Sequence, residues 1–154
     1  TMLEARARKN KVKLETLFTE KMLMSRGDPT HFWQAIMNIL LNAVQAMPDG
    51  GTIMISVKQF QNNEDHEEIV KVDTDYANAE HAEIHIKDQG PGIDAQNLDK
   101  IFQPFYTTRS EGTGLGLAIV KRLSDENHWH LKVKSYPDEG TEFIILIPVE
   151  DLNQ

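Results

Sequence analysis

The order of apolar patterns in this 154-residue chain predicts an α/β fold: a two-layer α/β sandwich, with a mixed sheet and its helices on one face. Strand-like alternation and helix-like spacing follow one another as strand, long helix, two strands, short helix, loop, helix and two strands. A tight-turn signal at Pro137–Gly140 joins the last two strands, so these run antiparallel. A doubly wound parallel sheet is therefore excluded.

The first two predicted elements are a strand and a long helix. Lys11–Phe18 alternates as a half-buried strand does, with Val12 and Leu14 facing inward. Apolar residues then recur at helical spacing through Thr30–Met47. Asp28, which a proline follows, is a typical N-cap, so we expect the helix to begin directly after it.

The rest of the chain predicts four more strands and two more helical segments. Alternating apolar residues indicate strands at Thr52–Val57, Ala82–Lys87, Leu131–Ser135 and Thr141–Ile147. Helical spacing indicates a short helical piece at Asp94–Ile101 and a helix at Leu115–Ser124, with a loop at Phe102–Gly112 between them. Together these elements complete the two layers.

One folded domain accounts for most of the chain. We expect residues 1–10 to be the end of a preceding helix or a linker, residues 11–150 the domain, and residues 151–154 a tail. An acidic insertion at 60–81 separates two strands, and Ile69–Val72 within it could pair as a short extra strand. A solvated loop is the preferred interpretation of this insertion, and a docking surface for a partner is the alternative.

Charge and composition exclude several classes of protein. A formal net charge of -8 argues against general nucleic-acid binding, which needs a basic surface. The absence of cysteine excludes disulfides and thiolate zinc sites. No apolar run reaches the length of a membrane span. We therefore expect a cytoplasmic domain without direct membrane contact, in a parent protein that could itself be membrane-anchored.

Asn38 and Asn42 lie four residues apart on the predicted long helix and so share one of its faces. A solvated helix face is the ordinary interpretation of such a pair. The functional interpretation is that the amide oxygens bind Mg²⁺, which keeps several waters and needs few protein ligands besides phosphate oxygens.

Asp88-Gln89-Gly90-Pro91-Gly92-Ile93 directly follows a predicted strand. The Asp88 carboxylate could accept a hydrogen bond from the amino group of a bound base. Gly90 and Gly92 permit positive φ and a close approach of the backbone to a flat ligand. An ordinary loop with an Asx-turn is the alternative.

The run Glu111–Leu117 places three alternating glycines before a predicted helix. Backbone N–H groups and the helix dipole can then face an anion. The run is neither a P-loop nor a dinucleotide fingerprint. A flexible loop that precedes a helix is the alternative.

Phe102–Arg109 places two phenylalanines around a proline and ends on a cation. A small hydrophobic anchor for the loop explains the aromatic residues. The functional interpretation adds a mobile lid, pinned by Phe102 and Phe105, that carries Arg109 toward phosphates.

Followed by Gly140-Thr141-Glu142-Phe143, these motifs resemble in their order the GHKL ATPase superfamily, and within it the catalytic domain of sensor histidine kinases. The resemblance extends over about Gly27–Pro148. It implies the Bergerat fold, which agrees with the two-layer sandwich, and it implies ATP and Mg²⁺ as ligands. The finer resemblance is to kinases of the nitrogen-regulation type.

The resemblance also implies a role for each matching position. Asn42 would be the principal magnesium ligand, Asn38 would assist at metal and phosphates, and Arg109 would complete the catalytic set. Asp88 would read the exocyclic amine of adenine, and Thr141 would hold a water beside the base. The other expected nucleotide contacts are Gly90, Gly92, Ile93, Phe105, Thr108, Gly112, Thr113, Gly114, Leu115, Gly116 and Leu117.

Asn38 also indicates the type of reaction. Hydrolysing relatives such as gyrase and the mismatch-repair ATPases carry a glutamate at this position, and an asparagine cannot act as a general base. The resemblance therefore implies transfer of the γ-phosphate to a histidine on a dimerisation domain of the same or a sister chain, with a response regulator receiver domain downstream. A self-contained GHKL ATPase or protein serine kinase is the alternative.

The chain departs from the family pattern at several positions. Gln45 replaces a basic residue, so we expect Arg109 or Lys121 to supply that charge. His128-Trp129-His130 replaces the usual His-Gly-Gly. None of the six histidines fits a phosphoacceptor, and His85 is expected on the exposed face of its strand.

Overall fold

The computed structural model describes residues 1–18, 23–60, 81–109 and 112–150 of the chain. Residues 61–80 of the acidic insertion, with the strand expected at Ile69–Val72, lie outside the described residues, as does the tail 151–154.

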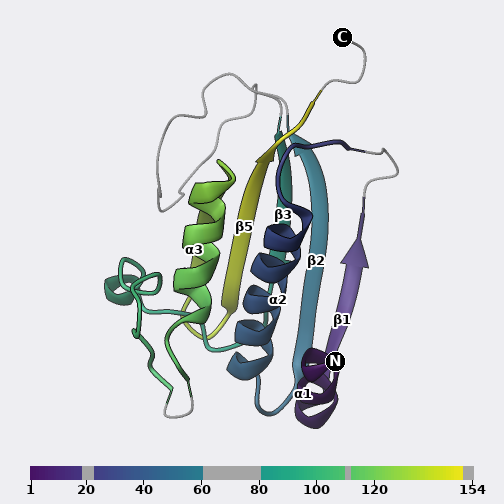
Figure 1. Ribbon diagram of the computed structural model, residues 1–154. Coiled ribbons are helices and arrows are strands. Elements are labelled where there is room, and N and C mark those ends of the chain that lie inside the picture. The colour runs from purple at the N-terminus through teal and green to yellow at the C-terminus, as the bar shows by residue number, and fades with distance from the viewer. Residues whose placement is uncertain (19–22, 61–80, 110–111, 151–154) are drawn as a thin grey trace.

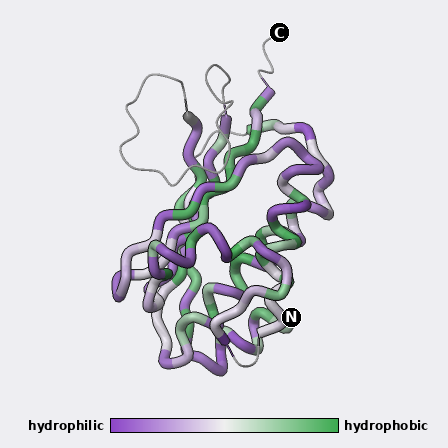
Figure 2. Tube along the Cα trace, turned by 90° about the vertical axis from the view of Figure 1, so that its left-hand side faces the viewer, coloured by the Kyte–Doolittle hydropathy of each residue, from purple (hydrophilic) through white to green (hydrophobic). Residues whose placement is uncertain are grey.

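The described elements form one five-stranded sheet with helices packed on one face (Figures 1 and 2). They are, in chain order, α1 (Met2–Asn10), β1 (Val12–Leu17), α2 (Pro29–Ala46), β2 (Gly51–Phe60), β3 (His81–Lys87), the 3₁₀ helix η1 (Ala95–Asn97), α3 (Gly116–Glu126), β4 (His130–Tyr136) and β5 (Gly140–Pro148). The strands are ordered β1-β2-β3-β5-β4. Only the β1–β2 pair is parallel, so the predicted mixed sheet is confirmed.

Helix α2 begins where the sequence predicts. Asp28 Oδ1 accepts from the backbone N–H of Thr30 at 2.8 Å and from that of His31 at 3.4 Å, and Pro29 stands at the first helical position. Such an N-cap contributes about 1 kcal/mol. One face of α2 is buried on the sheet, which leaves the face with the asparagine pair for other contacts.

The core lies between the sheet and helices α2 and α3. Ile86 of β3 pairs with Phe143 of β5, which pairs in turn with Val133 of β4. All three side chains are buried, together with Ile39 and Val44 of α2. Each fully buried apolar side chain of this size contributes about 1.5–3 kcal/mol. The core thereby fixes the strand ends and the loops that follow them.

Two expectations about local structure are wrong. Strand β1 buries only Val12, whereas Leu14 is 42% exposed. β1 is an edge strand, and the described helix beside it, α1, precedes it directly and reaches little of its length. The helical piece expected at Asp94–Ile101 is also shorter, since only Ala95–Asn97 form a 3₁₀ helix.

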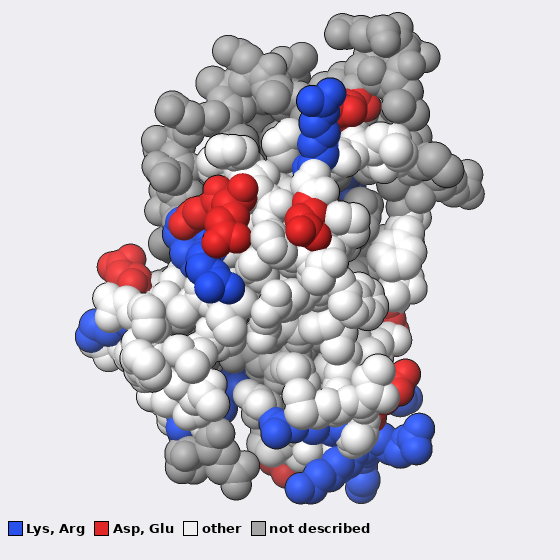
Figure 3. Space-filling view, in the orientation of Figure 1, with Lys and Arg blue, Asp and Glu red and all other residues white. Residues whose placement is uncertain are grey.

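Basic residues gather at one end of the molecule. Figure 3 shows Lys and Arg together at the lower edge of the helical face, beside α1. This region of the chain carries Arg6, Arg8, Lys9, Lys11 and Lys13. The overall negative charge is therefore unevenly distributed. Among the described residues no helix combines the length and the apolar character that a membrane span needs.

Candidate functional site

The asparagine pair of α2 faces the beginning of α3. The Asn38 side chain donates through Nδ2 to the Gln34 carbonyl oxygen at 3.0 Å, which orients its amide. Asn38 Oδ1 lies 3.5 Å from the point where a Cβ on Gly116 would stand. The last glycine of the Glu111–Leu117 run is therefore beside the asparagine helix, although 78 positions separate the two residues in the chain.

Arg109 extends from its loop onto α2. Its Nη1 donates to Gln45 Oε1 at 2.9 Å and to Asn42 Oδ1 at 3.4 Å, and its Nη2 donates to the Asn42 backbone oxygen at 3.3 Å. Lys121, the other expected source of positive charge, forms an ion pair with Asp125 on α3. Of the two cations, Arg109 is the one at the asparagine pair.

Asp88 is buried at the end of β3, with 3% of its surface exposed. Its Oδ1 accepts from the backbone N–H of Gly90 at 2.8 Å and from that of Thr141 at 3.1 Å. The Asp88 N–H donates to the Thr141 carbonyl oxygen at 2.9 Å. These bonds fix the carboxylate, and no hydrogen bond from a residue within the described ranges occupies Oδ2.

The electrostatics link this carboxylate to Arg109. Burial raises the pKa of Asp88, against the opposing effects of the Gly90 and Thr141 N–H groups and the positive charge of Arg109. Burial lowers the pKa of Arg109, and the negative charge of Asp88 opposes that change. The guanidinium thus contacts Asn42 directly, and its charge influences the Asp88 carboxylate.

The loop after Asp88 is attached to the β4–β5 turn. The Ile93 N–H donates to Ser135 Oγ at 2.6 Å, and the Asp138 N–H donates to the Pro91 carbonyl oxygen at 2.6 Å. Gly92 has a φ of 78°, as expected. Gly90 does not share this conformation. A Cβ on it would stand 3.0 Å from Ala46 Cβ, so Gly90 is needed for space rather than for φ.

The glycine run leads into α3 without a side-chain cap. Leu115 stands at the N-cap and makes no side-chain cap bond. Thr113 Oγ1 accepts only a long hydrogen bond, 3.4 Å, from the Leu115 N–H. First-turn N–H groups of a helix lack intrahelical partners, so this end of α3 can accept an anion. Gly112 is described, and residues 110–111 before it are not.

The expectation that Phe102 and Phe105 both pin the loop is half wrong. Phe102 packs edge-on against Phe143 with ring centroids 6.4 Å apart. Phe105 is 75% exposed and has a φ of 65°, and its N–H donates to the Gly114 carbonyl oxygen at 2.9 Å. Of the remaining expected contacts, Thr108 is exposed, whereas Ile93 and Leu117 pack partly buried against the core.

His85 is buried, which corrects its expected exposure. It lies on the sheet face that the helices leave free, but its Nδ1 is 2.6 Å from Glu142 Oε1 and its Nε2 is 2.8 Å from Glu83 Oε2. Burial would lower the pKa of His85, but the hydrogen bonds to the two carboxylates outweigh burial and raise it. The alternation along β3 predicts the sheet face on which His85 lies. It does not predict the burial of His85, because that depends on side chains of other strands.

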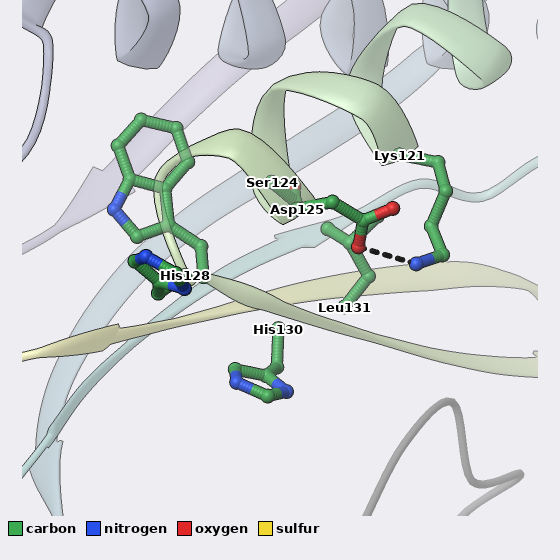
Figure 4. A pocket seen from close by; sticks show the side chains of 7 residues that line it. Lys121, Ser124, Asp125, His128, His130 and Leu131 are labelled. Atoms are coloured by element: carbon green, nitrogen blue, oxygen red, sulfur yellow. Dashed lines mark hydrogen bonds and ion pairs between the residues drawn. The ribbon is translucent and has the colours of Figure 1, made fainter.

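A pocket of about 170 Å³ lies elsewhere, between α3 and the start of β4 (Figure 4). Lys121 and Asp125 line it from α3, and His128 and His130 line it from the turn and strand that follow. The described part of the chain contains no group of three His, Cys, Asp or Glu side chains that could hold a metal. Two histidines alone do not make this pocket a metal centre.

Several of the site residues predicted from the sequence therefore lie close to one another. Asn42 meets Arg109, Asn38 meets Gly116, and the charge of Arg109 reaches Asp88. Gln45 was missed as a member of this set. Its position one turn after Asn42 places it on the same face of α2. An amide at that position does not by itself indicate a functional role, because its partner cannot be identified from the sequence.

Comparison with known proteins gives the same assignment. The family described as "Histidine kinase-, DNA gyrase B-, and HSP90-like ATPase" matches residues 27–151. Sporulation kinase A of Bacillus subtilis (strain 168) is 31% identical over 147 residues, which are 96% of this chain and 21% of that protein. Across the first three curated relatives, the chain spans between 18% and 31% of their length.

Solved structures agree with the sequence matches. The mycobacterial sensor histidine kinase MprB superimposes with a TM-score of 0.72 at 28% identity, over 98% of this chain and 91% of that one. A nucleotide-free catalytic domain of histidine kinase ThkA gives 0.72 at 25% identity, over 96% and 85%. The chain therefore belongs to the histidine kinase-, DNA gyrase B- and HSP90-like ATPase family, a family of ATP-binding domains, and the proteins it matches there are sensor histidine kinases.

Proposed function

We propose that the chain binds ATP together with Mg²⁺ and presents the γ-phosphate to a histidine on a separate dimerisation domain. A response regulator receiver domain would then take the phosphate from that histidine. One observation carries the proposal: the asparagine pair, Arg109 and the uncapped start of α3 converge beside a buried carboxylate. A polyphosphate with a base at one end fits this order of groups.

The residues of the asparagine pair suit a magnesium ion. Asn42 Oδ1 already contacts a cation, since it accepts from the Arg109 guanidinium. The Asn38 amide is turned by its bond to Gln34, so its oxygen faces the glycine run. Asn42 would hold the ion and Asn38 would assist. When bound, the ion would neutralise charge on the phosphate oxygens.

Asp88 is the proposed reader of the base. Because two backbone N–H groups hold Oδ1, Oδ2 is the oxygen that a ligand donor would meet. The exocyclic amine of adenine is such a donor. Thr141 lies beside this carboxylate, and its hydroxyl is 3.1 Å from Ser135 Oγ, in a position suited to sharing a water with the base.

The side chains favour transfer over hydrolysis. Asn38 stands where a water-activating carboxylate would be needed, and an amide cannot take up a proton at neutral pH. Phosphoryl transfer depends mainly on positioning and on charge stabilisation. The groups that converge here supply both, so the acceptor and its base would come from another domain.

Calorimetry with ATP tests the binding proposal. We expect the wild-type protein to give heat of binding with ATP, and its affinity for ATP should increase when Mg²⁺ is present. Asn42→Ala should lose most of the dependence on Mg²⁺, whereas Gln34→Ala, an exposed amide on the same helix, should keep it. A wild-type protein that is folded and gives no heat with ATP would overturn the proposal.

Labelling with γ-³²P-ATP tests the reaction type. We expect no label on any of the six histidines of this chain and no steady release of phosphate. Addition of a histidine-bearing dimerisation domain from the parent kinase should yield an acid-labile phosphohistidine on that domain. Steady turnover by the chain alone would instead favour the self-contained ATPase.

A further inference from the structure

Gln45 provides the shortest of the three hydrogen bonds that hold the Arg109 guanidinium on α2, 2.9 Å against 3.3 and 3.4 Å for the two Asn42 oxygens. Gln45 has no place in the roles derived above, and 64 positions separate it from Arg109. An amide oxygen is a good partner for a guanidinium and carries no charge that would keep the arginine there permanently.

We propose that Gln45 is a positioning residue that holds Arg109 on the Asn42 amide oxygen until a metal ion binds that oxygen or a phosphate binds the guanidinium. This inference rests on the proposed function, because Asn42 is the proposed magnesium ligand. The guanidinium donates to Asn42 Oδ1 at 3.4 Å. On release it is already beside the Asn42 side chain, where it can contact a phosphate.

The charges explain why the two cations alternate. A guanidinium and a divalent ion on one amide oxygen repel each other, so binding of the ion displaces Arg109 from Asn42. The negative charge of Asp88 also attracts the guanidinium. An incoming phosphate offers Arg109 a stronger partner than either amide, since guanidinium–phosphate bonds are charge-assisted on both sides.

This arrangement predicts that two changes affect the affinity for metal-free ADP differently, although both raise the ratio of affinities with and without Mg²⁺. Arg109→Gln removes the phosphate contact and the competitor together. Metal-free ADP should bind about tenfold more weakly, while the ratio of affinities with and without Mg²⁺ should rise about tenfold. Gln45→Ala leaves the cation in place but loosens its hold on Asn42. The affinity for metal-free ADP should change by no more than about twofold, and the ratio of the affinities with and without Mg²⁺ should rise about threefold.

Isothermal titration of the intact chain with ADP, with and without Mg²⁺, measures these ratios. Gln34→Ala and Arg122→Gln serve as matched controls, because both residues are exposed and, among the described residues, Arg122 forms its ion pair with Glu126 on α3. A purely structural role for Gln45 would weaken both affinities together and leave the ratio unchanged. That result would overturn the proposal.

A charge relocation adds a rescue test. A lysine at position 45 would place an ammonium group near the present position of the guanidinium, because Gln45 Oε1 contacts it directly. Gln45→Lys in the Arg109→Gln background should restore at least half of the tenfold loss in metal-free ADP affinity. Failure of this folded double variant to recover any affinity would contradict the assigned position of the charge.

The guanidinium can also be observed without any nucleotide. In ¹⁵N NMR spectra of the free protein, the Arg109 guanidinium should rotate more slowly than that of Arg122, an exposed arginine that serves as the reference. Gln45→Ala should restore free rotation. If Arg109 rotates as freely as Arg122 in the wild type, the positioning role is refuted whether or not ADP binds. Hindered rotation in a protein that binds no ADP would instead refute the nucleotide function alone.

Discussion

Replacing Asp88 with asparagine tests whether this residue reads the base, because the backbone around it dictates how the new amide lies. Oδ1 accepts from the N–H groups of Gly90 and Thr141 at 2.8 and 3.1 Å. The asparagine must keep its carbonyl oxygen on these donors, so its NH₂ replaces Oδ2. The exocyclic amine of adenine would then meet a donor instead of an acceptor.

The size of the effect follows from the burial of the site. A hydrogen bond to a charged group contributes about 1.5–3 kcal/mol, which corresponds to about 10- to 150-fold in affinity. Water cannot easily compensate, since Asp88 is only 3% exposed. ATP binding should therefore weaken by at least about tenfold. Inosine triphosphate carries an acceptor at the same ring position, so Asp88→Asn should narrow or invert the preference for ATP over it.

Stability should change in the opposite direction. Burial raises the pKa of Asp88, so the fold loses free energy as the pH rises from the unfolded-state pKa to the higher folded-state pKa, and the full cost remains above it. A neutral amide has no such cost. The free energy of unfolding of Asp88→Asn, relative to wild type, should therefore increase between about pH 4 and pH 7.

Calorimetry with both nucleotides and urea unfolding at several pH values check these outcomes. Asp49→Asn, at an exposed turn, is the matched control and should change neither nucleotide affinity. If the Asp88 variant is folded and binds ATP as tightly as wild type, Asp88 does not read the base and the orientation of the nucleotide derived above is wrong.

Three further predictions concern stability and the loops. His85→Gln should lower the free energy of unfolding at low pH. The difference from wild type should shrink as the pH rises through the raised pKa of His85, by at most about 1.4 kcal/mol per pH unit. Urea unfolding at a series of pH values from about pH 6 upward measures this difference. Gly114→Ala places a Cβ on a residue with a φ of 70°, a conformation that side chains disfavour. The free energy of nucleotide binding, measured by calorimetry, should therefore weaken by about 1 kcal/mol or more. Phe143→Ala should lower the free energy of unfolding by about 3–5 kcal/mol, seen as a lower urea midpoint.

The elements with strong periodicity were predictable from the sequence. Thr30–Met47 has both a cap and a full apolar stripe, and the helix Pro29–Ala46 differs from it by one residue at each end. The edge strand β1 was not predictable to the same degree. Its alternation is clear, but Leu14 is exposed because the described helices cover the middle of the sheet. Alternating apolar residues indicate a strand, whereas the burial of its side chains depends on which elements pack against it.

Most members of the site were predictable, but Gln45 and the contacts between the members were not. Asn42, Asp88 and Arg109 could be selected because each belongs to a motif with a chemical reason. The bond from Arg109 to Gln45 joins residues 64 positions apart, and nothing in either residue type specifies the other. Phe105 shows the converse error. An aromatic residue suggests burial, but its positive φ and its bond to Gly114 turn it to the surface.

The glycines of the motifs have a structural requirement that is separate from ligand binding. A Cβ on Gly92 would collide with the backbone of Tyr136, and one on Gly140 would collide with the backbone of Asp88. A Cβ on Gly114 would stand 2.7 Å from the Cα of Phe105. These clashes exist without any nucleotide, so loss of binding in a glycine variant cannot distinguish a ligand contact from a displaced loop. Asn42, Asp88 and Arg109 differ, because their side chains can be exchanged for shapes that the same backbone tolerates. Substitutions at these three positions are therefore the ones whose effects on nucleotide binding can be assigned to chemistry.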